Sequence, residues 1–345
     1  MGLFEEIDSR TAEGALCVAE NGAVRCTACA HRCLLEEGAR GVCRMRFNRG
    51  GKLMVPYGYV SAFSCDPVEK KPFFHVLPGS GALSFGMPGC NFSCSFCQNY
   101  DSSQLMRERT GACDIMDVTP DEITASALRC GARLVVSTYN EPTISAEWAA
   151  AVFAKAADKG LLCAFVSNGY ATKETVDFLR PYIRAFKVDL KCFDDNNYRR
   201  VMGGSLKPVL ETIERLHSYG IWVEIVTLVI PGFNDSDGEL QKLAGFIHGV
   251  SPDIPWHVTA FHPDYKMTDR SATTADTICR AAAIGRAAGL RFVYGGNVIA
   301  SALEDTLCPS CGHVVVARKG FKVCENRLAS GACPDCGKAV CGIWK

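Results

Sequence analysis

Three closely spaced cysteines offer the first chemistry in this chain. Cys90, Cys94 and Cys97 are separated by three and two residues, in a Gly- and Pro-containing loop that directly follows an apolar run. Thiolates bind iron–sulfur clusters, and a four-iron cluster normally takes four of them. A set of three would leave one iron open, whereas structural zinc uses a closed tetrahedral set. Three buried, unreactive cysteines are the alternative, but a loop broken by Gly and Pro is an unusual place for core residues, so the spacing favours a cluster.

A second group of cysteines lies near the N-terminus. It consists of Cys26, Cys29, Cys33 and Cys43, and glycines precede the last of them. Four thiolates can close around zinc or hold another cluster. The first spacing, of two residues, is common in zinc knuckles, and the second, of three, is less usual for zinc. We expect a metal rather than a metal-free loop, and zinc somewhat before iron–sulfur; His31, which lies between the cysteines, is expected to be a bystander.

The C-terminal region carries two matched Cys-Pro-x-Cys-Gly segments. Their cysteines are Cys308, Cys311, Cys333 and Cys336. Two such knuckles predict a zinc ribbon, with a rubredoxin-like iron site as the alternative. The ribbon could be structural, dock a partner or cover the mouth of the main domain. The isolated cysteines are expected in the core. They are Cys17, Cys65, Cys113, Cys130, Cys163, Cys192 and Cys279.

Composition limits the class of protein. The 345 residues include 20 cysteines and 48% hydrophobic residues, with 37 basic residues balancing 37 acidic ones. Zero net charge gives no indication of electrostatic capture of nucleic acid or of a membrane surface. The acidic start lacks the basic and apolar regions of a signal peptide, and no apolar run approaches the roughly 18 residues needed to span a bilayer. So many cysteines favour metal binding in a reducing cytoplasm over disulfides.

The central part of the chain alternates apolar runs with helical patterns. The strands are expected at residues 82–85, 134–139, 162–167, 185–190, 222–230, 257–261 and 291–294. Near-continuous apolar strands between helices predict a parallel sheet covered by helices. Six or seven units are too few for a full eight-fold barrel, so an incomplete (βα)6-type barrel is expected. The predicted divisions are a Cys-rich module at 1–55, the barrel at 56–300 and a zinc-ribbon-like module at 301–345.

Polar residues follow these strands where parallel strands end at one edge of a sheet. They are Asn140, Glu141, Asn168, Asp189, Lys191 and His257. Each has an ordinary explanation by itself, such as a turn or a surface ion pair. Together they predict a site at the carboxyl edge of the sheet, facing the three-cysteine loop.

The motif Cys90-x3-Cys94-x2-Cys97, with Phe96 before its last cysteine, resembles that of the radical S-adenosylmethionine (SAM) enzymes. The resemblance implies an incomplete barrel, a [4Fe–4S] cluster and SAM bound to the open iron. It also implies reductive cleavage of SAM to methionine and a 5′-deoxyadenosyl radical that abstracts hydrogen, with flavodoxin or ferredoxin as electron donor.

A finer resemblance covers nearly the whole chain. The segments from Asp66 to Ser80 and from Gly89 to Asn99 are similar to the radical SAM member of the AmmeMemoRadiSam system, which is related to the activating enzymes of pyruvate formate-lyase. This implies Memo- and Amme-type proteins as possible partners. The segment 66–80 is either a solvated loop or part of the mouth of the site.

The resemblance assigns the strand-end residues to SAM. Glu141 matches the glutamate of a Gly-Gly-Glu-Pro motif more securely than Asn140 matches its glycine, and both could accept hydrogen bonds from the methionine ammonium. Lys191, in the element Asp189-Leu190-Lys191, could pair with the SAM carboxylate, and Asn168 could bond the ribose. His257 would lie near SAM or substrate. Thr259-Ala260-Phe261 replaces the Ser-Arg-Phe of many relatives, so no role of that arginine carries over.

The function that the resemblance implies is hydrogen abstraction from a protein or another substrate, as in glycyl-radical activation. Modification of an RNA or a small metabolite is the alternative, although neutral charge argues against a large nucleic-acid footprint. A non-catalytic binding or electron-transfer protein stapled by metals is a third hypothesis; it predicts that no 5′-deoxyadenosine forms.

Overall fold

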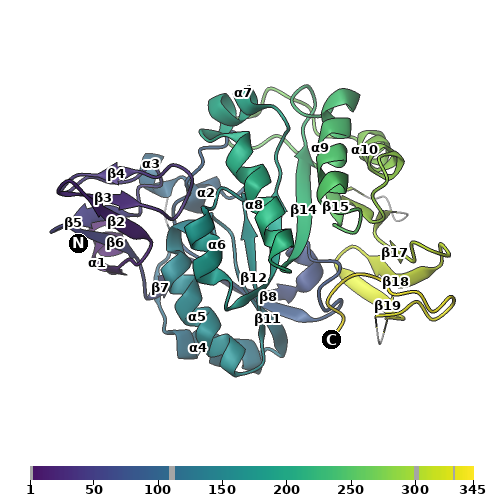
Figure 1. Ribbon diagram of the computed structural model, residues 1–345, viewed down its shortest axis with the longest axis horizontal. Coiled ribbons are helices and arrows are strands. Elements are labelled where there is room, and N and C mark those ends of the chain that lie inside the picture. The colour runs from purple at the N-terminus through teal and green to yellow at the C-terminus, as the bar shows by residue number, and fades with distance from the viewer. Residues whose placement is uncertain (1–2, 109–112, 299–302, 329–330) are drawn as a thin grey trace.

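A computed structural model describes residues 3–108, 113–298, 303–328 and 331–345. An N-terminal module, a central α/β unit and a C-terminal ribbon follow one another along the longest axis of the molecule (Figure 1). The two Cys-rich modules therefore lie at opposite ends, with the central unit between them. Among the described residues, no helix is long and apolar enough to cross a membrane.

The central unit is built on an eight-stranded sheet with the order β16-β15-β14-β13-β12-β11-β9-β8. Its strands are β8 (Ala62–Pro67), β9 (Gly81–Gly86), β11 (Ala132–Ser137), β12 (Leu162–Ser167), β13 (Ile183–Asp189), β14 (Trp222–Val229), β15 (Trp256–Ala260) and β16 (Val293–Gly296). Strands β9 to β16 pair in parallel, and only β8 is antiparallel to its neighbour. The expected incomplete parallel barrel is confirmed, with strand ends within two residues of the predicted ones.

Helices connect the parallel strands and cover their outer face. They are α4 (Pro120–Arg129), α5 (Ala146–Asp158), α6 (Lys173–Leu179), α7 (Asp195–Asn197), α8 (Leu206–Ser218), α9 (Asp237–Val250) and α10 (Ala275–Ala287). Thr119 begins α4 through the reciprocal capping box with Glu122. Gly160 follows α5 with φ +75°, a conformation that glycine adopts without strain. Short helical segments are α2 (Tyr100–Ser103), α3 (Leu105–Glu108), η1 (Val68–Lys70), η2 (Pro142–Ser145) and η3 (Tyr198–Met202).

The segment between β8 and β9 fills the inside of the barrel. Val68, Phe73 and Val76 form a buried cluster with small and apolar residues of β9, β11, β12 and β13. The charged Glu69 and Lys71 are buried as well, at 1% and 5% exposure. Of the two interpretations of residues 66–80, the solvated loop is therefore wrong for this part, because the charges are paired internally: Lys71 with Asp66 at 2.9 Å and Glu69 with Arg318 at 3.6 Å.

The N-terminal module is a set of short antiparallel strands. They are β1 (Thr11–Glu13), β2 (Cys17–Glu20), β3 (Ala23–Cys26), β4 (Leu34–Leu35), β5 (Phe47–Arg49) and β6 (Lys52–Pro56), preceded by α1 (Leu3–Ser9). The sheet orders are β1-β6-β5 and β2-β3-β4, and β7 (Tyr59–Val60) pairs with β10 (Met116–Asp117). The buried residues of the module belong to the same hydrophobic core as the outer face of the barrel. A buried ion pair, Arg46 with Glu147 of α5 at 2.7 Å, joins the two parts.

The C-terminal ribbon is a three-stranded sheet, β17 (Thr306–Leu307), β18 (Val314–Lys319) and β19 (Lys322–Asn326). It shares a small core with the barrel, which includes Phe74, Phe292 and Tyr294. Arg318 of the ribbon donates to the Phe74 carbonyl at 2.7 Å and lies over the Phe74 ring. The ribbon is thus fixed to the segment that fills the barrel.

The isolated cysteines divide into three groups, and one of them, Cys17 and Cys113, is partly buried. Cys163 and Cys192 are buried, as expected, but Cys65, Cys130 and Cys279 are exposed, and their assignment to the core is wrong. Cys65 lies on the edge strand β8 and Cys130 ends α4. Cys279 lies beside the buried stripe of α10 rather than in it.

Candidate SAM and iron–sulfur site

The three-cysteine loop leaves the sheet at the end of β9. Gly86 closes that strand, where a Cβ would stand 2.4 Å from the Thr138 carbonyl oxygen, so the loop can begin close to β11 only without a side chain. Cys94 is 7% exposed, and Cys90 and Cys97 are partly buried. The Phe92 amide lies 3.4 Å from the Cys90 sulfur, and the Ser103 hydroxyl 3.2 Å from the Cys97 sulfur.

All three sulfurs open into a cavity of about 520 Å³ at the carboxyl ends of the strands. Each parallel strand, or the loop after it, contributes to its lining: Cys90, Cys94 and Cys97 after β9, Asn140 and Glu141 after β11, Asn168 after β12, Asp189 and Lys191 at β13, Val226 and Leu228 of β14, His257 and Thr259 of β15, and Gly295 and Gly296 of β16. Every residue that the sequence placed at this edge is therefore brought to one cavity. The six strand-end residues and the three cysteines meet there.

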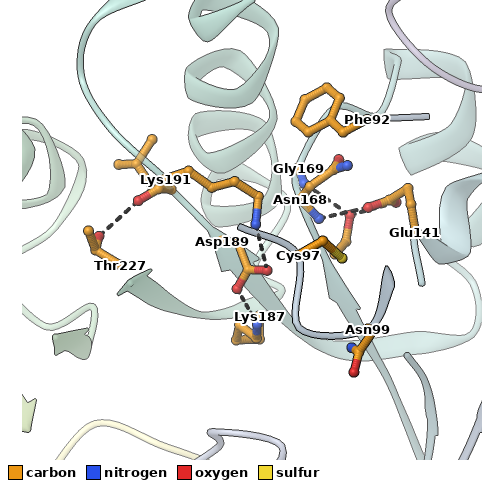
Figure 2. A network of polar contacts seen from close by, with 12 residues as sticks. Phe92, Cys97, Asn99, Glu141, Asn168, Gly169, Lys187, Asp189, Lys191 and Thr227 are labelled. Carbon is orange, nitrogen blue, oxygen red and sulfur yellow. Dashed lines mark hydrogen bonds and ion pairs between the residues drawn. The ribbon is translucent and has the colours of Figure 1, made fainter. Parts of the chain in front are cut away.

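Glu141 holds the turn after β12 (Figure 2). One carboxylate oxygen accepts hydrogen bonds from the Thr143 amide at 3.0 Å and the Ser167 hydroxyl at 2.8 Å, and the other accepts one from the Asn168 amide at 2.7 Å. Burial raises the pKa of Glu141, although these donors oppose the rise. The hydrogen bonds of the Glu141 carboxylate go to protein donors, so its main effect is to position Asn168.

Two backbone conformations shape these turns. Tyr139 has φ +75° without being glycine, and its carbonyl accepts a hydrogen bond from the Asn99 side chain at 2.8 Å. Gly169 has φ +73°, and a Cβ there would stand 2.7 Å from the Val188 side chain. Glycine is therefore required at 169 by packing against β13 and by conformation.

Lys191 points into the cavity beside the cysteine loop and is held by Asp189 at 3.3 Å (Figure 2). Asp189 also pairs with Lys187. Burial alone would raise the pKa of Asp189, but the two lysines outweigh it and lower that pKa to about 2. Burial would likewise lower the pKa of Lys191, and Asp189 and the Cys94 thiol outweigh it and raise it. The site thus keeps a fixed positive charge near Cys94.

His257 lines the cavity and pairs with Glu224. The imidazole donates to the buried Glu224 carboxylate at 2.7 Å, and the carboxylate also accepts from the Phe74 and His75 amides at 3.0 and 2.9 Å. Burial would raise the pKa of Glu224, but His257 and these amides lower it. Glu224 therefore anchors both the cavity wall and the segment that fills the barrel.

Burial disfavours the thiolate forms of Cys90 and Cys94, which a bound metal would favour. Burial raises the pKa of Cys94 to about 12, against the opposing charge of Lys191, and raises that of Cys90 further. Metal ligands must be deprotonated, so binding here releases protons and depends on pH. The positive charge of Lys191 partly compensates the thiolates.

Sequence reasoning missed several residues of the site. Lys187 and Phe321 line the cavity, and Glu224 supports it. Lys71 also lines the cavity, in agreement with the interpretation of residues 66–80 as part of the mouth. Lys187 and Glu224 are charged residues inside apolar strands, which is a signal that could have found them, because buried charges are usually paired. Phe321 of the ribbon had no such signal, since the fold alone brings it to the cavity.

The other two cysteine groups differ in geometry. The four C-terminal sulfurs lie within 4.8 Å of one another, with pairs at 3.6 Å. Elsewhere in the described part of the chain, no group of three cysteine, histidine or acidic ligands is so tight. The C-terminal group could thus hold one metal ion, and Cys324 and Cys341 are not part of it.

The pattern of the radical SAM superfamily matches residues 85–244. Protein MJ0808 of Methanocaldococcus jannaschii is 35% identical over 325 residues, which cover 93% of this chain and 96% of that protein. The chain belongs to the radical SAM superfamily. The pyruvate formate-lyase-activating enzyme of Streptococcus mutans is 22% identical over 191 residues, 54% of this chain and 72% of that enzyme. A radical SAM methyltransferase from Sphaerobacter thermophilus has a TM-score of 0.47 at 18% identity, covering 69% of this chain and 71% of that one.

The residues of the cavity fit the cofactors of a radical SAM enzyme. Membership implies a [4Fe–4S] cluster and SAM, and three cysteines in one loop that line the cavity provide ligands for three irons. The Asn140 side-chain oxygen is a buried acceptor without a partner among the described residues, and it lines the cavity. Such an acceptor needs a donor from a bound molecule, and the methionine ammonium of SAM is one.

Proposed function

We propose that the chain reductively cleaves SAM at a [4Fe–4S] cluster bound by Cys90, Cys94 and Cys97, and uses the resulting radical to abstract hydrogen from a protein. The convergence of three cluster ligands and six strand-end residues on one cavity carries this proposal. Similarity to pyruvate formate-lyase-activating enzymes supports a protein substrate, and zero net charge favours it over RNA. The reductant is proposed to be a flavodoxin or ferredoxin.

The bound cofactors supply one-electron cleavage of SAM to methionine and a 5′-deoxyadenosyl radical. The chain positions and shields the reactants. Lys191, kept charged by Asp189, binds the carboxylate of SAM, and the free oxygen of Asn140 accepts from its ammonium. Glu141 fixes Asn168 for the ribose. Phe96, Val226 and Leu228 line the cavity and exclude water from the radical.

Lys191→Met is expected to weaken SAM binding without removing the cluster. Hydrogen bonds to charged groups contribute about 1.5–3 kcal/mol, so the Kd should rise by about 10- to 100-fold. Equilibrium dialysis of reconstituted protein with labelled SAM measures this, with iron content determined on the same sample. Lys173→Met, which removes a lysine that is 61% exposed on α6, is the matched control. An unchanged Kd in Lys191→Met would remove Lys191 from the SAM site.

The substrate class is tested by the origin of the abstracted hydrogen. An extract of cells of the source organism grown in D2O is separated into protein, RNA and small-molecule fractions, and each is incubated with reduced enzyme and unlabelled SAM. Mass spectrometry of 5′-deoxyadenosine should show one deuterium with the protein fraction. Label from only the RNA or the small-molecule fraction would favour the alternative, modification of such a substrate within an AmmeMemoRadiSam system with Memo- and Amme-type partners.

We also propose zinc at Cys308, Cys311, Cys333 and Cys336, and three units at residues 1–55, 56–300 and 301–345. Sulfur pairs at 3.6 Å support zinc, because a Zn–S bond of about 2.3 Å gives tetrahedral edges of roughly 3.8 Å. The ribbon that this ion would hold places Phe321 at the cavity. We propose that it covers part of the mouth.

A further inference from the structure

Four cysteines of the N-terminal module form a buried group. Cys26, Cys29 and Cys43 are less than 10% exposed and Cys33 is partly buried; we call these four the N-terminal quartet. The Cys26 amide donates to the Cys33 carbonyl at 2.9 Å, and the Val42 amide lies 3.4 Å from the Cys33 sulfur. Cys26, Cys29 and Cys43 belong to one buried cluster of side chains, and Cys33 packs against it. The four side chains share one buried region.

The quartet is too open for a single ion. Among the described residues, only the four C-terminal sulfurs form a group tight enough for a single ion, and the quartet does not. The same wide spacing holds for Cys90, Cys94 and Cys97. In a polynuclear cluster the thiolates are shared among different irons, so they stand further apart than around zinc. The spacings of the two groups are also similar. The first three cysteines of the quartet are separated by two and then three residues, and those of the cysteine loop by three and then two. This geometry reverses our sequence-based preference for zinc.

Asn91 connects the quartet to the SAM site. It directly follows Cys90, and its side-chain oxygen lies 3.8 Å from the Cys90 sulfur. Its amide group faces Cys29, and its side-chain nitrogen is a buried donor without a hydrogen-bond partner of good geometry in the described residues. Asn91 is 1% exposed. An unpaired buried N–H costs free energy, and a thiolate or sulfide at Cys29 would accept its hydrogen bond.

Other contacts join the N-terminal module to the cysteine loop. The carbonyl of Asn91 accepts a hydrogen bond from His31, two residues after Cys29, at 2.9 Å. Arg107 donates to both the Val42 carbonyl at 2.9 Å and the Cys90 carbonyl at 2.7 Å. A Cβ at Gly89 would overlap the Met45 side chain at 2.4 Å. Asn91 therefore lies between Cys29 of the quartet and Cys90 of the cysteine loop.

We propose that the N-terminal quartet binds a second iron–sulfur cluster, which passes one electron to the cluster at Cys90, Cys94 and Cys97. A low-potential one-electron donor protein is oxidised by one electron as the second cluster is reduced. That electron then crosses Asn91 and reduces the SAM-site cluster, returning the second cluster to its oxidised state. The metal site stands by itself, and the relay rests on the proposed function of the SAM site.

Metal analysis tests the site separately from catalysis. In the full chain with Cys90, Cys94 and Cys97 all replaced by alanine, anaerobic reconstitution with iron and sulfide should leave about two or four irons per chain. Adding Cys26→Ala should remove them, whereas Cys17→Ala should not. Cys17 pairs with Cys26 across strands β2 and β3 and lies outside the quartet, which makes it a matched control. Zinc instead of iron, or loss of iron with Cys17→Ala but not with Cys26→Ala, would overturn the proposal.

Electron transfer tests the relay. In the chain with an intact cysteine loop, Cys26→Ala should keep the electron paramagnetic resonance signal of the SAM-site cluster after slow reduction with dithionite. It should lose the fast phase of reduction by photoreduced flavodoxin, and Cys17→Ala should retain that phase. An unchanged fast phase in Cys26→Ala would contradict the relay. Both readouts precede SAM cleavage, so failure of the proposed activity would leave them interpretable.

Discussion

Cys94→Ala is expected to leave the chain folded but to remove the SAM-site cluster and SAM binding together. Cys94 is one of only three local ligands, and its loss leaves two, fewer than the three that hold the cluster with one iron open. The loop itself has other anchors, since the Ser93 amide donates to the Met202 carbonyl at 2.8 Å and Arg107 binds the Phe92 carbonyl. Iron analysis and SAM dialysis after anaerobic reconstitution measure both effects, against whatever iron the rest of the chain retains.

Cys163→Ala is the matched control for this change. Cys163 is also a buried thiol, at 1% exposure, but it lies on β12, in the hydrophobic core, and its sulfur donates hydrogen bonds to the Phe153 and Leu161 carbonyls. It should keep full iron content and SAM affinity. Normal SAM binding in Cys94→Ala would contradict the assignment of the cluster to this loop.

Arg46→Ala is expected to lower the free energy of unfolding by about 3–5 kcal/mol, because it leaves a buried carboxylate without its partner. Arg46 and Glu147 are 2% and 8% exposed and make two parallel hydrogen bonds at 2.7 and 2.8 Å. Glu147 also accepts from the Leu16 amide. Urea unfolding followed by far-UV circular dichroism measures the loss. The double variant Arg46→Met, Glu147→Leu should recover most of it, since well-packed apolar pairs often replace buried ion pairs.

The same pair predicts a pH dependence. Burial would raise the pKa of Glu147, but Arg46 outweighs it and lowers that pKa in the folded chain. Because the pKa of Glu147 is lowered in the folded chain, the pair stabilises the fold above the unfolded pKa of about 4.3. This stabilisation is lost as the pH falls through the folded pKa. The difference in stability between the parent chain and Arg46→Ala should therefore shrink below about pH 4. A constant difference from pH 7 to pH 3 would contradict a charged pair.

The central sheet could be predicted because its strands are buried on both faces and read as apolar runs. Strand β8 and the segment that fills the barrel could not, because prolines and charges between residues 66 and 78 are typical of loops. One of those charges, Glu69, is compensated by a partner far away in the sequence. Glu69 pairs with Arg318, and such a pairing leaves no local pattern.

The candidate site was predictable where its residues are close together in the sequence or follow neighbouring parallel strands. The spacing of Cys90, Cys94 and Cys97 is local, and strand ends share an edge once the sheet is parallel. The roles of Asn91 and Phe321 were not, because they depend on how the two outer modules contact the barrel. The quartet shows the same limit. Its spacing admitted zinc or an iron–sulfur cluster, and the cluster that we propose rests on contacts between the N-terminal module and the cysteine loop.

The most direct test of the central claim is 5′-deoxyadenosine formation under anaerobic conditions. Reconstituted chain is reduced with dithionite, mixed with SAM and analysed by liquid chromatography and mass spectrometry, beside Cys94→Ala and Cys163→Ala. We predict 5′-deoxyadenosine and methionine in equal amounts from the parent chain and from Cys163→Ala, and none from Cys94→Ala. A parent chain that carries a reduced cluster but neither binds SAM nor forms 5′-deoxyadenosine would contradict the account and favour a non-catalytic metal protein.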